Sequence, residues 1–207
     1  PIDSDVGLWI TESSRLSLEG RPKSEWTRLV GSVGAGVRTI TVADAAGWEI
    51  GDVIVVCPTE PQTVGADFWQ RFDQRPIVGV VGNVITLDAV LEFSHPAVEL
   101  RGTVYTAEVL NLTRDVVIQG RPGLRTHIFT RSLAPQTLRY VTVRDTGPRR
   151  GDERIAGRWA VHFHHPGFGE TPPSLVEGVV VHRCGSWGFV AHGMRRRTDL
   201  ARTATFR

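Results

Sequence analysis

The segment 157–167, GRWAVHFHHPG, contains three histidines whose type and spacing could bind a metal ion or transfer protons. Side chains of an extended strand alternate between its two faces, so His162 and His164 share one face and lie about 7 Å apart along it. Neutral imidazoles bind Zn²⁺ at about 2.0 to 2.1 Å. The pattern predicts a divalent metal ion, the only cofactor indicated, bound by His162, His164 and His182, with His165 and His192 as further candidates.

Two other interpretations of these histidines stay open. No close-spaced zinc signature accompanies them, and a solvent-facing or hydrogen-bonded histidine ladder explains the same residues. Histidine is also the residue most often used as a general acid or base near neutral pH.

Charged residues surround the loop that precedes the histidine segment. Hydrolysis of a glycosidic bond needs two carboxyl groups about 5 to 9.5 Å apart, and this loop could supply them, although a solvated connection is the simpler interpretation. Aromatic rings near the loop could stack on sugars or serve as core residues. The candidate catalytic residues are His162, His164, Asp152, Arg158 and Arg114, and the candidate substrate-binding residues are Trp159, Arg144, Asp145 and Trp187.

The elements that must position these residues are short strands. The chain of 207 residues contains 22 Gly and 12 Pro but a single Met, a composition that favours strands and turns over helices. Trp48-x-x-Gly51-Asp52 predicts a tight turn in which the carboxylate of Asp52 accepts hydrogen bonds from backbone amides, and Gly82-Asn83 predicts a hairpin. We therefore expect an all-β fold.

From about residue 110 the β-like segments recur more regularly. Val143, Val161 and Val181 are 18 and 20 residues apart, which suits successive coils of a β-solenoid. This alignment predicts an outward-facing ladder of three pairs: Thr142 and Arg144, His162 and His164, Val180 and His182.

Bulk properties exclude several classes of protein. A formal net charge of +2 is too small to predict nucleic-acid binding, and no stretch of about 18 apolar residues predicts a membrane span. Cys57 and Cys184 are too few for a disulfide scaffold and are expected to be buried thiols.

The chain resembles a known family in the order of its motifs. Residues 21–95 contain Trp26-Thr27-x-Leu29, Trp48-x-x-Gly51-Asp52-Val53 and Leu91-x-Phe93-x-His95, followed by Leu112-Thr113-Arg114-Asp115-Val116 and Gly157-Arg158-Trp159-Ala160-Val161-His162-Phe163-His164. This order is similar to that of the extracellular domain named for its eight glycines, which occurs in the cell-migration-inducing hyaluronan-binding protein, the cell-surface hyaluronidase and fibrocystin-like proteins. Asp115 and Trp159-Ala160 depart from the family pattern.

The resemblance implies a bacterial relative that is secreted or on the cell surface: a right-handed parallel β-helix with a glycine-rich β domain at its start. We expect a lead-in at 1–20, the glycine-rich domain at 21–108, β-helix coils at 109–193, and a frayed or truncated end at 194–207. The implied partner is a polysaccharide, such as the glycosaminoglycan hyaluronan, which the protein would bind or depolymerise as a hydrolase or lyase. The alternatives are a non-catalytic structural or adhesion module, such as part of a phage tail fibre, and a metal-dependent hydrolase of a small substrate. A homo-oligomer fits β-helix fibres, but the sequence has no interface signature.

Overall fold

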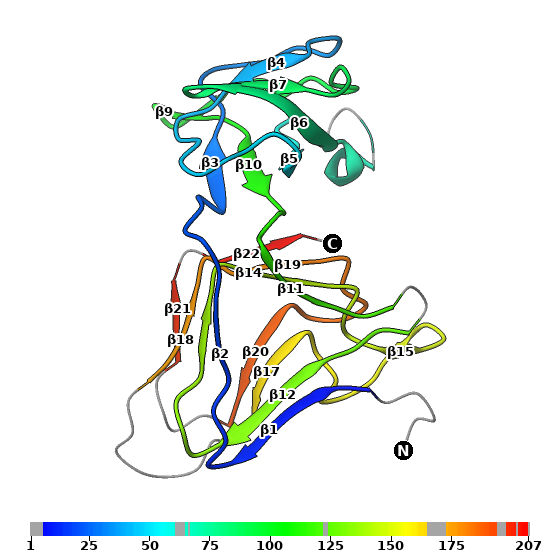
Figure 1. The fold of residues 1–207 in the computed structure, drawn as a ribbon. Coiled ribbons are helices and arrows are strands. Elements are labelled where there is room, and N and C mark those ends of the chain that lie inside the picture. Colours follow the sequence, from blue (N-terminus) through cyan, green and yellow to red (C-terminus); the bar gives the residue numbers. More distant parts are fainter. Residues whose placement is uncertain are drawn as a thin grey trace. The chain divides into compact units, whose positions relative to one another are not determined.

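The computed structural model describes residues 6–60, 65, 67–121, 124–164, 173–193, 198–201 and 203–206. The chain forms two compact units, which are coloured by sequence in Figure 1. One comprises Pro1–Pro22 and Arg114–Arg207, and the other is Lys23–Thr113. The second unit is therefore an insertion in the chain of the first.

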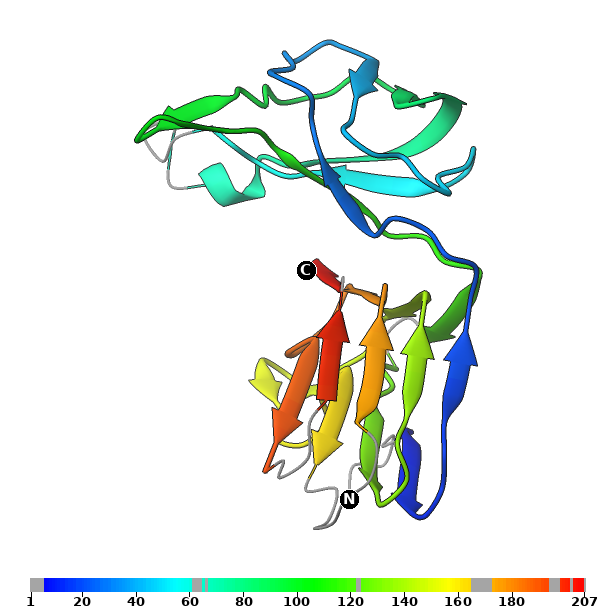
Figure 2. The same cartoon turned by 90° about the vertical axis from the view of Figure 1, so that its left-hand side faces the viewer.

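The first unit is a right-handed parallel β-helix with three sheets, as expected for an all-β chain whose parallel strands are joined by crossovers. Each sheet takes one strand from each of four coils, and Figure 2 shows the strands of sheet 2 side by side and pointing the same way. Sheet 1 contains β1 (Leu8–Glu12), β12 (Ile128–Ser132), β17 (Val161–His164) and β20 (Phe189–His192). Sheet 2 contains β2 (Ser17–Glu19), β13 (Thr137–Arg139), β18 (Ser174–Glu177) and β21 (Thr198–Ala201). Sheet 3 contains β11 (Val116–Gln119), β14 (Val141–Arg144), β19 (Val180–His182) and β22 (Ala204–Phe206). A short hairpin of β15 (Arg149–Arg150) and β16 (Glu153–Arg154) lies between coils two and three along the chain.

Alternate side chains of these strands stack inside the β-helix. In sheet 1, Ile128 pairs with Val161, which pairs with Phe189, and in sheet 3 Val143 pairs with Val181. All five belong to or pack against one hydrophobic cluster. The intervening residues, His162 and His164 among them, must therefore face outward, as their alternation with Val161 and Phe163 predicts.

The predicted register of the coils is wrong. Val143 and Val181 are parallel partners, but Val161 belongs to a different sheet, where it pairs with Ile128 and Phe189. The 18- and 20-residue spacings are each a step of part of a coil, from sheet 3 to sheet 1 and back to sheet 3. His162 and His182 are consequently not neighbours on one ladder.

Both ends of the chain differ from expectation. Residues 8–12 and 17–19, in the predicted lead-in, are strands of the first coil, and β1 pairs with β12 across 120 positions. Part of the predicted frayed end forms the fourth coil, because β21 and β22 pair in parallel with β18 and β19. The glycine-rich segment is thus inserted within the first coil, between β2 and β11, rather than placed before the β-helix.

The inserted unit is built around an antiparallel sheet of six strands in the order β3-β10-β5-β6-β7-β4, with a separate hairpin. The sheet contains β3 (Trp26–Arg28), β4 (Thr39–Thr41), β5 (Val53–Val56), β6 (Asp73–Val81), β7 (Val84–Leu87) and β10 (Glu108–Asn111); the hairpin pairs β8 (Val98–Leu100) with β9 (Thr103–Tyr105). The one helical element among the described residues is the 3-10 turn η2 (Phe68–Gln70), so no described helix has the length and hydropathy to span a membrane.

Both turn predictions for this unit are confirmed. Gly82 and Asn83 connect β6 to β7, with φ of 58° at Gly82. The carboxylate of Asp52 accepts a hydrogen bond from the backbone amide of Glu49 at 3.0 Å, and Gly51 has φ of 94°.

Asp52 also anchors a buried polar network. Its two oxygens accept hydrogen bonds from Nζ of Lys23, the only lysine of the chain, at 2.7 and 2.9 Å. Nδ2 of Asn111 donates to the same carboxylate at 2.8 Å. Both members of the ion pair are buried, so each charge depends on the other for compensation.

Gly120 follows β11 at a point where two coils approach closely. A Cβ atom there would overlap the carbonyl oxygen of Asp145 and lie 2.8 Å from the amide nitrogen of Thr126, so the backbone would have to move. We expect Gly120→Ala to destabilise the β-helix by about 1–3 kcal/mol, the usual cost of overpacking, as measured by urea unfolding. Gly34→Ala is the matched control because its Cβ would meet no atom within 4 Å, and equal destabilisation by both substitutions would contradict the prediction.

Candidate functional site

The outer face of sheet 1 carries aromatic rings that are in register from coil to coil. Trp9 pairs with Phe129, which pairs with His162 on the next strand. The rings of Trp9 and Phe129 are 4.6 Å apart between centroids, and those of Phe129 and His162 are 5.2 Å apart. Because parallel strands hold equivalent residues at the strand spacing, the fold itself stacks these rings.

A second group of rings adjoins this row. Trp159, in the loop before β17, lies 4.2 Å from the ring of His162 and 5.4 Å from that of Trp187. Trp187 is 53% exposed and Trp9 is 45% exposed. We call the rings of Trp9, Phe129, Trp159 and Trp187 the aromatic row.

Two arginines flank the aromatic row. The guanidinium carbon of Arg158 lies 4.7 Å from the ring centroid of Trp9, and that of Arg154 lies 5.3 Å from the ring centroid of Trp187. Stacking on an aromatic face holds a guanidinium in place while its edge remains able to donate hydrogen bonds. This face therefore presents apolar rings bordered by positive charge.

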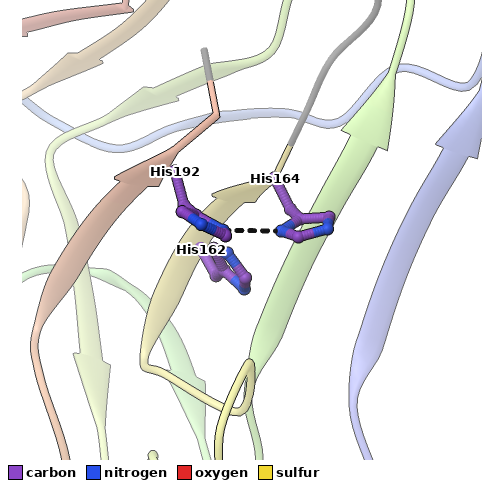
Figure 3. Close-up of side chains that lie close together, drawn as sticks. All are labelled: His162, His164 and His192. Carbon is purple, nitrogen blue, oxygen red and sulfur yellow. Dashed lines mark hydrogen bonds between the residues drawn. The ribbon is translucent and has the colours of Figure 1, made fainter.

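Three histidines converge beside the aromatic row, as Figure 3 shows. His164 pairs with His192 on the neighbouring strand, and their Nδ1 atoms are 3.1 Å apart. One ring nitrogen from each of His162, His164 and His192 lies within 4.8 Å of the other two. The three differ in exposure, from His162, which is 1% exposed, through the half-buried His164 to the exposed His192. We call these residues the histidine triad.

The backbone fixes the protonation of His162. Its Nδ1 lies 3.0 Å from the carbonyl oxygen of Gly157, and since a carbonyl only accepts, Nδ1 carries the proton. Burial lowers the pKa of His162 to about 4, opposed by the bond to Gly157, and the positive charges of His164 and His192 lower it further. The neutral ring has a lone pair on Nε2, which is buried without a hydrogen-bond partner among the described residues.

The predicted ligand set is corrected in one member. His182 lies on sheet 3, where it pairs with Arg144 and not with the histidine strand. Arg144 donates to the side chain of Gln119 at 2.7 Å, and Asp145 forms an ion pair with Arg183 at 2.6 Å. These candidates therefore form a separate cluster at the end of sheet 3, and His192 takes the place of His182 in the histidine triad.

The other predicted residues are divided between the site and the scaffold. His162, His164, Trp159, Trp187 and Arg158 lie together on or beside sheet 1. By contrast, Arg114 is buried and its Nε donates to the carbonyl oxygen of Gly178 at 3.1 Å, which connects coils one and three. Asp152 is exposed in the β15–β16 turn, where its carbonyl oxygen accepts a hydrogen bond from Arg149. His165 lies outside the described residues.

The sequence predictions missed Trp9, Phe129 and Arg154. Trp9 falls in the segment interpreted as a lead-in, although the apolar run Leu8-Trp9-Ile10 within polar surroundings is typical of a short strand. Phe129 alternates with Ile128 and Thr130, which are both buried, and this alternation marks it as an outward-facing residue.

Comparisons with known proteins agree with the resemblance in the sequence. No protein-family profile matches the chain. The chain is similar to a G8 domain-containing protein of Dictyostelium discoideum, with 26% identity over 166 residues, covering 76% of this chain and 14% of that protein. It is also similar to fibrocystin-L of Mus musculus, with 36% identity over 128 residues, covering 58% of this chain and 3% of that protein. The chain thus spans a small part of these relatives.

Solved structures with a similar arrangement include two phage tailspikes. The gp49 tailspike of Pseudomonas phage LKA1 matches with a TM-score of 0.39 and 16% identity, covering 87% of this chain and 29% of that one. The Gp54 tailspike of Acinetobacter baumannii bacteriophage AP22, solved in complex with a capsular saccharide, matches with a TM-score of 0.36 and 11% identity, covering 90% of this chain and 30% of that one.

Proposed function

We propose that this chain is part of an extracellular protein that binds polysaccharide along the outer face of sheet 1. The observation that carries the proposal is the aromatic row, whose rings follow one another across the strands. Three strand spacings separate β1 from β20, about 15 Å, which is enough for several consecutive sugar rings. Exposed tryptophan rings present the apolar surface on which the C–H faces of sugars stack.

The two flanking arginines support an anionic chain as the ligand. Arg158 and Arg154 bring guanidinium groups to the border of the aromatic row, and guanidinium binds carboxylates through paired hydrogen bonds. A glycosaminoglycan such as hyaluronan alternates such carboxylates with neutral sugars, in agreement with the resemblance stated above. We therefore propose a uronic acid-containing polysaccharide as the ligand class.

The test is a comparison of anionic and neutral polysaccharides by affinity electrophoresis and calorimetry. We expect Trp187→Ala to weaken binding of hyaluronan or chondroitin about two- to tenfold, as expected for a stacked ring contributing about 0.5–1.5 kcal/mol. Trp69→Ala is the control, because Trp69 is 61% exposed but lies in the inserted unit. Equal effects of the two substitutions, or equal affinity for dextran, would contradict the proposal.

The same incubations separate binding from cleavage. His162, His164 and Arg158 lie beside the aromatic row and would be the acid–base and charge-neutralising groups of a depolymerising enzyme. New reducing ends would assign hydrolysis, and new unsaturated ends would assign elimination. Retention without new ends would favour a binding or adhesion module, the alternative that needs no catalytic residue.

A further inference from the structure

We propose that the histidine triad, His162, His164 and His192, binds one divalent late transition-metal ion, with Zn²⁺ as the reference ion. The geometry is the first argument. With metal–nitrogen distances of about 2.0–2.1 Å, tetrahedral coordination separates two nitrogens by about 3.3 Å. The Nδ1 atoms of His164 and His192 are already 3.1 Å apart, and one nitrogen of each of the three rings lies within 4.8 Å of the others.

The second argument is the state of His162. Metal-binding histidines usually donate their other ring N–H to a backbone carbonyl or carboxylate, which fixes the tautomer and the ring. His162 has this arrangement, with Nδ1 bonded to Gly157 and the opposite nitrogen, Nε2, buried without a hydrogen-bond partner among the residues described. A buried acceptor left in this way costs free energy, and coordination to a cation would recover it.

The third argument is how the three rings are supported. His162 is packed against Trp159 and Phe129 and supplies a fixed ligand. His164 and His192 are more exposed, so their rings can turn about side-chain bonds to complete the coordination. Because these two face solvent, at least one coordination position remains open to water.

The donor set decides the class of ion. Imidazole nitrogens suit Zn²⁺, Co²⁺, Ni²⁺ and Cu²⁺, whereas Mg²⁺ and Ca²⁺ prefer oxygen ligands. The triad contains nitrogen donors alone. Millimolar Mg²⁺ or Ca²⁺ should therefore fail to displace Zn²⁺ from the site.

The experiment uses the whole chain without a polyhistidine tag, stripped with chelator and titrated with Zn²⁺ by calorimetry near neutral pH. We expect one ion per chain, and at least a tenfold loss of affinity in His192→Ala, since even the loss of a partner that orients a ligand costs ten- to a hundredfold. His192 is exposed, so this variant should fold. Co²⁺ provides a second readout, because its visible absorption reports on nitrogen coordination in the wild-type chain and should disappear in the variant.

Two control variants make the result specific. His182→Asn removes a histidine from sheet 3 and should leave Zn²⁺ affinity unchanged. Trp187→Ala removes a ring of the aromatic row but keeps all three nitrogens, so it should weaken polysaccharide binding and leave Zn²⁺ binding intact. The metal site and the proposed function can therefore fail independently. Absence of stoichiometric Zn²⁺ binding, or unchanged affinity in His192→Ala, would overturn the metal site.

Discussion

Replacing Asp52 with alanine is expected to destabilise the inserted unit by about 3–5 kcal/mol, the usual cost of removing one partner from a buried ion pair. The side chains of Asp52 and Lys23 are only 4% and 7% exposed, and the variant would leave the ammonium group of Lys23 buried without a counter-charge. It would also remove the acceptor for Nδ2 of Asn111. Urea unfolding followed by circular dichroism would measure the loss.

The matched control for this substitution is a surface ion pair of the same unit. Arg28 and Glu108 are 3.0 Å apart, but both side chains are largely exposed. Because solvent screens such pairs, Glu108→Ala should cost no more than about 1 kcal/mol. If Asp52→Ala costs no more than Glu108→Ala, the network does not stabilise the unit as proposed. Lys23→Met should restore part of the stability lost in Asp52→Ala, because it removes the unpaired charge.

Acid should destabilise the β-helix through His182. Burial lowers the pKa of His182 to about 4, and the neighbouring cations Arg183 and Arg144 lower it further, while Asp145 opposes the shift. The unfolded value is about 6.5, so between pH 6.5 and 4 the unfolded chain binds a proton that the folded chain does not. Stability is therefore highest above pH 6.5 and falls as the pH drops, by about 3 kcal/mol in total for this group.

The comparison with His182→Asn isolates this contribution, because asparagine does not titrate. Moving from pH 7.5 to pH 5 should cost the wild-type chain about 2 kcal/mol more than it costs the variant, as measured by chemical unfolding at each pH. The difference matters more than the absolute loss, since other groups titrate in both proteins. Parallel pH profiles for the two chains would show that His182 is not responsible.

The fold class could be predicted from the sequence because period-two alternation and glycine-rich turns are local signals. The coil length could not, because it is not constant: 33 residues separate Ile128 from its partner Val161, and 28 separate Val161 from Phe189. Three sheets per coil also make equal valine spacings ambiguous, since part of a coil and a whole coil both return an inward-facing position. The first coil was hidden for a different reason, which is that the inserted unit separates β2 from β11.

The candidate site was predicted in its centre and missed at its edges. The alternation of Val161, His162, Phe163 and His164 correctly placed two imidazoles on one outer face. Their third partner depended on register, and a local pattern cannot decide between His182 and His192. Trp9 reaches the site through pairing between strands 120 residues apart, for which a single sequence carries no signal.

The insertion within the first coil also bears on the order of folding. Closing a flexible loop over residues 23–113 would cost roughly 4 kcal/mol of chain entropy before β2 and β11 could join one coil. The inserted unit meets this cost itself, because the amide of Asn111 donates to the carbonyl of Glu25 at 2.9 Å and so holds its two ends together. The first coil is thereby coupled kinetically to a unit with a separate core, and its assembly should wait until that unit has folded.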